Sequence, residues 1–284
     1  MSTVRRVHRF TAPLLVCAAL AGAPAMAASL CSEQAQTASA PATVSCSSKA
    51  LQIDSGSAGQ RRVVYQVPSG TPPAGGWPVV LLYHGSLTKV SNFVYNSDMP
   101  FGGYYQGKLV QGLLDHGYAV LAPNALTAAE AWETNADAFA NNYSQSNDYL
   151  FFNNLFASIA KGSFGPLNSQ RQYAAGISSG GYNSSRMAVS FPGKFRALAI
   201  QSASYASCVG ARCTLPATLP ANHPPTLFVH GMADRVVPWS SMQPYHDRLL
   251  YQGIDTALYS EPSGAHQWFA ASPGQILDWF TRHP

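Results

Sequence analysis

Residues 176–180, which read Gly-Ile-Ser-Ser-Gly, constrain the fold of this chain more than any other stretch, because they fit the pattern G-x-S-x-G. An apolar strand is predicted to end at Gly176 and a helix to begin at Gly180 or Gly181, which would place Ser178 on a sharp turn between them. Side chains at the two outer glycines would collide with such a turn. The pattern also arises by chance in chains rich in glycine and serine, so its meaning depends on residues elsewhere.

Residues 1–27 have the features of a secretory signal peptide. Three arginines precede an apolar stretch at residues 11–21, and residues 25–27, Ala-Met-Ala, fit the small-residue cleavage site of such leaders. The apolar stretch is shorter than the roughly 20 residues that span a bilayer, and no later stretch is long and apolar enough. We therefore expect a secreted protein without a membrane anchor. Cys17 raises a lipoprotein alternative, which is weakened by the bulky Val16 before it.

Removal of this leader changes the charge of the chain. The leader holds three arginines and no acidic residue, so the net charge falls from +4 to +1. Proteins that bind nucleic acid usually carry a dense basic patch. The nearly neutral mature chain therefore predicts no nucleic-acid partner, and nothing in it predicts a particular oligomeric state.

Four cysteines remain after the leader, at positions 31, 46, 208 and 213. In an exported protein an even number favours two disulfides, for which three pairings are possible. The most local pairing joins Cys31 to Cys46 and Cys208 to Cys213, while free buried thiols are the alternative. No C-x-x-C spacing or histidine cluster accompanies the cysteines, so we expect neither a metal nor another cofactor.

The 257 residues after the leader fit a polar segment at 28–60, followed by one large α/β domain at 61–284. Strands and helices are predicted to alternate in this domain, which indicates a mostly parallel sheet with helices on both faces and no separate substrate-binding domain. The predicted strands are 61–67, 77–83, 118–122, 171–175, 195–201, 226–230 and 256–260. The predicted helices are 104–116, 148–160, 182–191, 240–252 and 273–281.

Two further loops at strand ends carry residues that could act together with Ser178. Asp234 follows the strand at 226–230, and His266 follows the strand at 256–260. An imidazole that removes the serine proton, held by a carboxylate, is what acyl transfer requires. The order Ser178, Asp234, His266 is that of the α/β-hydrolases. The alternative for Asp234 is an ordinary ion pair with Arg235, and the other histidines lack the required order and loop.

The stretch His84-Gly85-Ser86 follows the strand at 77–83 and suggests an oxyanion hole. Two backbone N–H groups aimed at the carbonyl oxygen stabilise the negative charge that develops there. We expect one from Ser179 and the other from Ser86, with Gly85 as the second choice. His84 would then shape the site or touch the substrate rather than take part in the chemistry.

Four blocks of sequence carry a resemblance to a known family: Tyr-His-Gly-Ser at 83–86, Gly-Ile-Ser-Ser-Gly-Gly-Tyr at 176–182, His-Gly-Met-Ala-Asp-Arg-Val-Val-Pro at 230–238 and Gly-Ala-His-Gln-Trp at 264–268. They resemble the secreted polyhydroxyalkanoate depolymerases, above all the medium-chain-length type that degrades poly(3-hydroxyoctanoate). The resemblance implies an extracellular bacterial serine esterase that cuts a water-insoluble aliphatic polyester. It also implies that Ser178, Asp234 and His266 form its triad.

This chain differs from related esterases in two features that bear on its substrate. Short-chain depolymerases and the feruloyl or acetylxylan esterases often have Cys where this chain has Ser86, and many carry additional binding modules. The medium-chain type is therefore favoured, and the other esterases and a non-catalytic exported binding protein remain alternatives. As polymer contacts we expect Trp239 and Trp268, with the aromatic segments 93–105 and 132–143, although ordinary core packing explains any one of these aromatics equally well.

Overall fold

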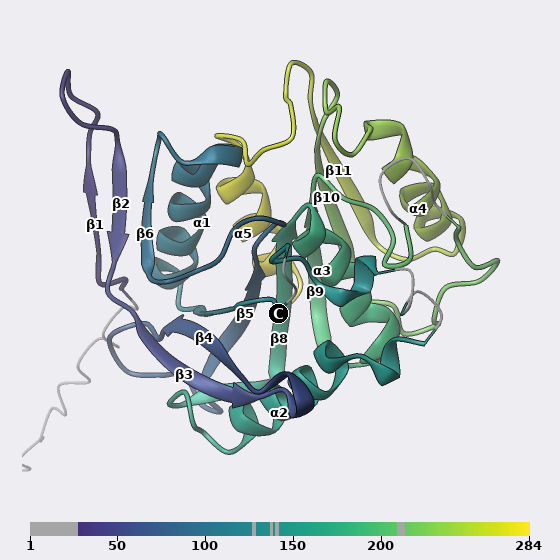
Figure 1. Cartoon of the computed structure of the whole chain (residues 1–284), viewed down its shortest axis with the longest axis horizontal. Helices are drawn as coiled ribbons and strands as arrows, with labels where there is room; N and C mark the ends of the chain where they lie inside the picture. Colours follow the sequence, from purple (N-terminus) through teal and green to yellow (C-terminus); the bar gives the residue numbers. More distant parts are fainter. Residues whose placement is uncertain (1–27, 127–128, 137–138, 140–141, 209–213) are drawn as a thin grey trace, which may run out of the picture.

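A central mixed sheet organises the computed structural model, which describes residues 28–126, 129–136, 139, 142–208 and 214–284. Within these residues the sheet has eight strands in the order β11-β10-β9-β8-β5-β7-β4-β3 (Figure 1). The strands are β3 (Lys49–Asp54), β4 (Gln60–Gln66), β5 (Trp77–Tyr83), β7 (Ala119–Pro123), β8 (Leu167–Ile177), β9 (Phe195–Gln201), β10 (Thr226–Gly231) and β11 (Thr256–Glu261). Only the pairings of β3 with β4 and of β4 with β7 are antiparallel.

Helices cover both faces of this sheet, as the alternation of strands and helices predicts. They are α1 (Gly103–Asp115), α2 (Asn147–Ala160), α3 (Ser179–Ser190), α4 (Trp239–Tyr251) and α5 (Ser272–Arg282). The first and last pack on one face, and α2 and α3 pack on the other. Residues of α4 cluster with Ile200 and Phe228 at the β9–β11 end of the sheet (Figure 1).

Strand β5 illustrates why the central strands are continuous apolar runs. Val80 and Leu82 belong to the core under α1 and α5, whereas Val79 and Leu81 belong to the core under α2 and α3. All four side chains are fully buried. A strand buried on both faces has no polar side to alternate with, which is why β5 could be predicted with its correct bounds.

The polar segment at 28–60 contains strands that the sequence pattern did not predict. β1 (Cys31–Gln34) pairs with β2 (Thr43–Cys46), and β2 pairs with β6 (Phe93–Asn96), to form a small antiparallel sheet beside α1 (Figure 1). The third strand of the segment, β3, joins the central sheet. These strands are short and mostly polar, so their pairing partners rather than their own composition determine them.

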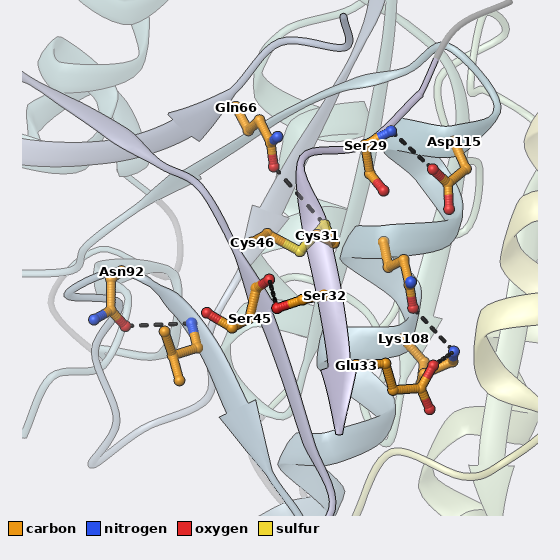
Figure 2. The surroundings of a disulfide bond; sticks show 12 residues. Ser29, Cys31, Ser32, Glu33, Ser45, Cys46, Gln66, Asn92, Lys108 and Asp115 are labelled. Carbon is orange, nitrogen blue, oxygen red and sulfur yellow. Dashed lines mark hydrogen bonds and ion pairs between the residues drawn. A yellow bond between two sulfur atoms is a disulfide. The ribbon is translucent and has the colours of Figure 1, made fainter. Parts of the chain in front are cut away.

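The small sheet is held by two kinds of bond. A disulfide joins Cys31 to Cys46, in agreement with the local pairing predicted for these cysteines. In Figure 2, Glu33 of β1 lies next to Lys108 of α1, and the ion pair between them spans 2.6 Å. The other predicted pair, Cys208 with Cys213, includes a residue outside the described part of the chain.

The N-terminal leader also lies outside the described residues. Among the helices that the structure describes, none combines the length and apolar character that crossing a bilayer requires.

A buried ion pair connects β4, the strand next to the edge of the sheet, to α2. Arg61 of β4 bonds Asp148 of α2 at 2.5 Å, and both side chains are 1% exposed. The guanidinium also donates to Ser55 Oγ and lies over the Phe151 ring, while the second carboxylate oxygen accepts from the Glu133 amide. Burial raises the pKa of Asp148, and the attraction of Arg61 opposes this rise.

Replacement of Asp148 by alanine is expected to lower the free energy of unfolding by about 3–5 kcal/mol, because Arg61 would be left charged and unpaired in the core. Denaturant unfolding followed by circular dichroism measures the difference. The matched control is Asp278→Ala, which removes an Asp–Arg pair at 3.1 Å whose side chains are 65% and 55% exposed. This control should cost less than about 1 kcal/mol. Equally small losses in both variants would show that Arg61 does not depend on Asp148.

Candidate active site

Ser178 lies on the sharp turn that the G-x-S-x-G pattern predicts. It stands between the end of β8 and the start of α3, with a backbone φ of 56°. This left-handed conformation is unfavourable for a residue with a side chain and is found where the surrounding structure enforces it. The Ser178 amide donates to the carbonyl of Gln201, at the end of β9, at 3.0 Å.

The two outer glycines of the pattern allow this turn to form. A Cβ atom on Gly180 would lie 2.3 Å from the carbonyl oxygen of Tyr83 and 2.6 Å from that of His84. A Cβ atom on Gly176 would lie 2.4 Å from the Gly180 oxygen. Because these neighbours are backbone atoms, they have little freedom to move aside. Only glycine lets α3 approach β5 and β8 this closely.

Asp234 and His266 meet at the ends of β10 and β11. His266 Nδ1 is 2.8 Å from Asp234 Oδ2, while Asp234 Oδ1 accepts from the amides of Val236 and Val237 at 2.9 Å. Burial opposes ionisation of this carboxyl, but the bonds from His266 and the two amides outweigh burial and hold the pKa of Asp234 below its usual value. The site therefore contains a buried carboxylate that fixes the orientation of an imidazole.

Close packing holds the acid loop and the histidine loop together. The Ala233 amide donates to the Gly264 carbonyl at 2.9 Å, and a Cβ atom on Gly231 would lie 2.2 Å from that same oxygen. His230 is fully buried behind Asp234, with its Nε2 bonded to the Val237 carbonyl at 2.9 Å. Burial lowers the pKa of His230.

Ser178 and His266 line the same small pocket, together with Gly85, Ser86 and two apolar residues. Among the described residues no hydrogen bond joins the Ser178 hydroxyl to the His266 ring. Catalytic hydrogen bonds are often long until substrate binds. The structure thus brings together the serine, the histidine–aspartate pair and the loop that was expected to supply the oxyanion hole.

The predicted oxyanion donors lie on either side of Ser178. Ser86 borders the pocket, and Gly85 is so close that a Cβ atom there would lie 3.5 Å from Ser178 Cβ. Ser179 is the first residue of α3, where backbone N–H groups have no partner within the helix. Its side chain faces inward and accepts from the Trp132 amide at 2.9 Å.

The candidate substrate contacts fall in different places. His84 is 2% exposed, its Nδ1 bonds the Gly85 carbonyl, and its Nε2 accepts from the Ala125 amide. Burial lowers its pKa. The two backbone bonds connect this histidine to the loops after β5 and β7. Trp268 is also buried, at 1% exposure, and forms an inner wall near the site. Trp239 begins α4 and donates to Ser260 Oγ, and it lies outside the pocket of Ser178.

Half of the aromatics in the two nominated segments are core residues. In the segment 132–143, Trp132 and Tyr143 are buried, and part of the segment lies outside the described residues. In the segment 93–105, Phe93 and Tyr95 are buried, whereas Phe101 is 38% exposed. Core packing therefore explains four of these aromatics.

Sequence reasoning did not single out two residues that support the site. Phe101 was named only within a segment, yet its ring stands edge-on to the His266 ring, with centroids 5.8 Å apart. Gln201 is fully buried, and its amide nitrogen donates to the Gln267 carbonyl in the histidine loop at 2.8 Å. A glutamine directly after the apolar run at residues 197–200 was the available signal for the second residue.

No protein-family model matches the chain. A poly(3-hydroxyoctanoate) depolymerase from Pseudomonas fluorescens is 62% identical to it over 270 residues, a match that covers 95% of this chain and 97% of the relative. The chain belongs to the poly(3-hydroxyoctanoate) depolymerase family. This membership agrees with the resemblance seen in the four blocks of sequence.

Solved structures support the fold of this family member. The S-formylglutathione hydrolase FrmB from Staphylococcus aureus matches with a TM-score of 0.56 at 15% identity, over 87% of this chain and 99% of that chain. An α/β serine hydrolase from Xanthomonas campestris matches with a TM-score of 0.53 at 15% identity, over 83% of this chain and 93% of its own. The predicted α/β-hydrolase fold is confirmed.

Replacement of Gly180 by alanine is expected to lower the free energy of unfolding by about 3 kcal/mol or more, because the new methyl group would overlap two backbone carbonyls. Denaturant unfolding measures the change. Gly112 offers a matched control, since it lies inside α1 and a Cβ atom there would meet nothing within 4 Å. Gly112→Ala should raise stability by roughly 0.5–1 kcal/mol. A Gly180→Ala variant as stable as the native protein would contradict the close approach at the turn.

Proposed function

We propose that this chain is an extracellular serine esterase that hydrolyses the ester bonds of poly(3-hydroxyoctanoate) and related medium-chain polyhydroxyalkanoates. One observation carries the proposal. A serine on a strained strand–helix turn shares its pocket with a histidine that is bonded to a buried aspartate, in a chain 62% identical to a poly(3-hydroxyoctanoate) depolymerase.

The roles of the three residues follow from their chemistry. With Nδ1 bonded to Asp234, the His266 ring presents Nε2 as a base toward Ser178. The serine oxygen attacks the ester carbonyl as its proton passes to Nε2, and the alcohol end of the polymer leaves with that proton. Water then attacks the acyl-enzyme by the same route and releases the hydroxyacid. Asp234 stabilises the imidazolium formed in each half of the cycle.

The amides of Ser86 and Ser179 serve as the oxyanion hole. They flank the serine from two directions, one on the loop after β5 and the other at the N-terminus of α3. Both are backbone groups on elements held by close packing, so they need little rearrangement as the negative charge develops. Gly85 contributes by leaving room beside the Ser178 side chain.

Export from the cell accords with the chemistry of the chain and of its substrate. A disulfide such as Cys31–Cys46 persists in oxidising compartments, and residues 1–27 read as a secretory leader. A water-insoluble polymer outside the cell cannot be taken up whole, so it has to be degraded where it lies. The enzyme therefore acts outside the cell and releases monomers or short oligomers.

The Ser178→Ala variant is expected to lose activity on a poly(3-hydroxyoctanoate) latex by at least about 10⁴-fold, because the other hydroxyl of the turn, on Ser179, faces inward and bonds the Trp132 amide. Clearing of the latex and release of 3-hydroxyoctanoate measure the activity. Ser240→Ala, at an exposed position of α4, is the control and should leave activity unchanged. Residual hydrolysis in the Ser178 variant would overturn the mechanism. Wild-type release of ferulate or acetate, without release of hydroxyoctanoate, would overturn the substrate.

The Asp234→Asn variant is expected to lower kcat by roughly 10³–10⁴-fold with little change in KM, because the imidazolium loses its counter-charge and preferred tautomer. Hydrolysis of p-nitrophenyl octanoate gives both constants. Asp255→Asn is a matched control, since Asp255 makes an exposed hydrogen bond of 2.8 Å to His283. That control should retain wild-type kinetics. Equal losses in the two variants would argue against a special role for Asp234.

A further inference from the structure

A second, larger cavity adjoins the small pocket of Ser178. The pocket of Ser178 has a volume of about 20 Å³, whereas the neighbouring cavity, which we call the side pocket, has about 250 Å³. The two share three wall residues: Gly85, Phe101 and Ile177. The side pocket therefore opens beside the reacting serine.

The difference in volume decides what each space can hold. A cavity of roughly 10–15 Å³ holds one water molecule, so the pocket of Ser178 accepts a group about the size of one water. That is enough for the carbonyl group under attack. The alkyl chain of a medium-chain acyl group must extend elsewhere, and the side pocket offers more than ten times the volume at an adjoining wall.

The walls of the side pocket are mixed, with polar residues such as Lys89 and Gln106 beside an apolar part that suits an alkyl chain. Its inner walls include the buried apolar residues Val90, Ile177 and Trp268. At its lip, Val94 and Met99 are exposed by 39% and 38% respectively, although both are large apolar side chains. Exposed apolar side chains that gather around a cavity commonly mark a binding site.

Phe101 is held at the boundary of the two spaces. Its backbone has a φ of 58°, and its carbonyl accepts from the Trp268 amide at 2.8 Å, which ties it to the histidine loop. Gly102 permits this contact, since a Cβ atom there would lie 2.3 Å from the Trp268 oxygen. With its ring edge-on to His266, Phe101 separates the pocket of Ser178 from the side pocket.

Another cavity, of about 420 Å³, is a poorer candidate although it is larger than the side pocket. Its walls come from residues 30, 47–49, 65–67 and 163–166, and it shares none of them with the pocket of Ser178. A chain that is covalently attached to Ser178 has no adjoining route into that cavity.

We propose that the side pocket binds carbons 4 to 8 of the 3-hydroxyoctanoyl unit esterified to Ser178, and that residues at its lip, with Val94 foremost, set the preference for medium-length acyl chains. This inference rests on the proposed esterase function. A four-carbon acyl group places at most its last carbon in the side pocket, so longer groups gain more from burial there.

Narrowing the lip tests the inference. Val94→Trp and, as a second position, Met99→Trp are compared with wild type by kcat/KM on p-nitrophenyl octanoate and p-nitrophenyl butyrate, which share a leaving group. We expect the octanoate-to-butyrate ratio to fall by at least about tenfold, while kcat/KM for butyrate stays within about twofold. Leu250→Trp, at an exposed apolar position of α4 outside the side pocket, is the control and should leave the ratio unchanged.

The outcomes separate this inference from the function on which it rests. An unchanged ratio in both lip variants, with wild-type enzyme active, would overturn the side pocket and leave the esterase function intact. An equal loss on both substrates would also overturn the side pocket, because it would show general damage to the site. Absence of wild-type turnover on either ester, or turnover that survives in Ser178→Ala, would overturn the esterase function and the inference with it.

Discussion

The close approach of α3 to the ends of β5 and β8 is the constraint on which the active site depends. With no side chain on Gly176 or Gly180, the backbone of the helix can lie against the carbonyl oxygens of Tyr83 and His84. The chain must then reverse within one residue, and Ser178 adopts a φ of 56° to do so. The same contact brings the N-terminus of α3 beside the loop that carries the other expected oxyanion donor. Strain at a single residue thus places the proposed nucleophile beside the expected oxyanion donors.

Gln201 links the serine turn to the loop of His266, the proposed general base. Its carbonyl accepts from the Ser178 amide, and its side-chain nitrogen donates to the Gln267 carbonyl, next to His266. Its side-chain oxygen accepts from Ser272 at the start of α5. A fully buried amide with all these bonds made has one favourable orientation. The serine turn and the histidine loop are therefore held in a fixed position relative to each other. The end of β9 therefore connects, through hydrogen bonds, two loops that are far apart in sequence.

The parts that could be predicted from sequence are those that local pattern determines. Strands buried on both faces, such as β5, are continuous apolar runs. Ser178 follows the buried apolar end of β8 and Asp234 follows the buried strand β10, whereas His266 follows the half-buried strand β11. The short strands β1, β2 and β6 depend on one another and carry no such run. Trp268 was nominated because it is close to His266 in sequence, but its side chain turns inward. The position of Phe101 depends on a contact with residue 268, so no local pattern could indicate it.

Chemistry and substrate choice are supported by different parts of the molecule. The three residues of the proposed triad follow the carboxyl ends of β8, β10 and β11 in the central sheet. The proposed side pocket instead takes a wall from β6, whose Phe93 pairs with Cys46 across the small sheet. The disulfide shown in Figure 2 joins β1 to β2, the strand that pairs with β6, and so belongs to the sheet that carries this wall. Changes in the N-terminal strands can then alter which acyl chains fit while the geometry of hydrolysis stays intact.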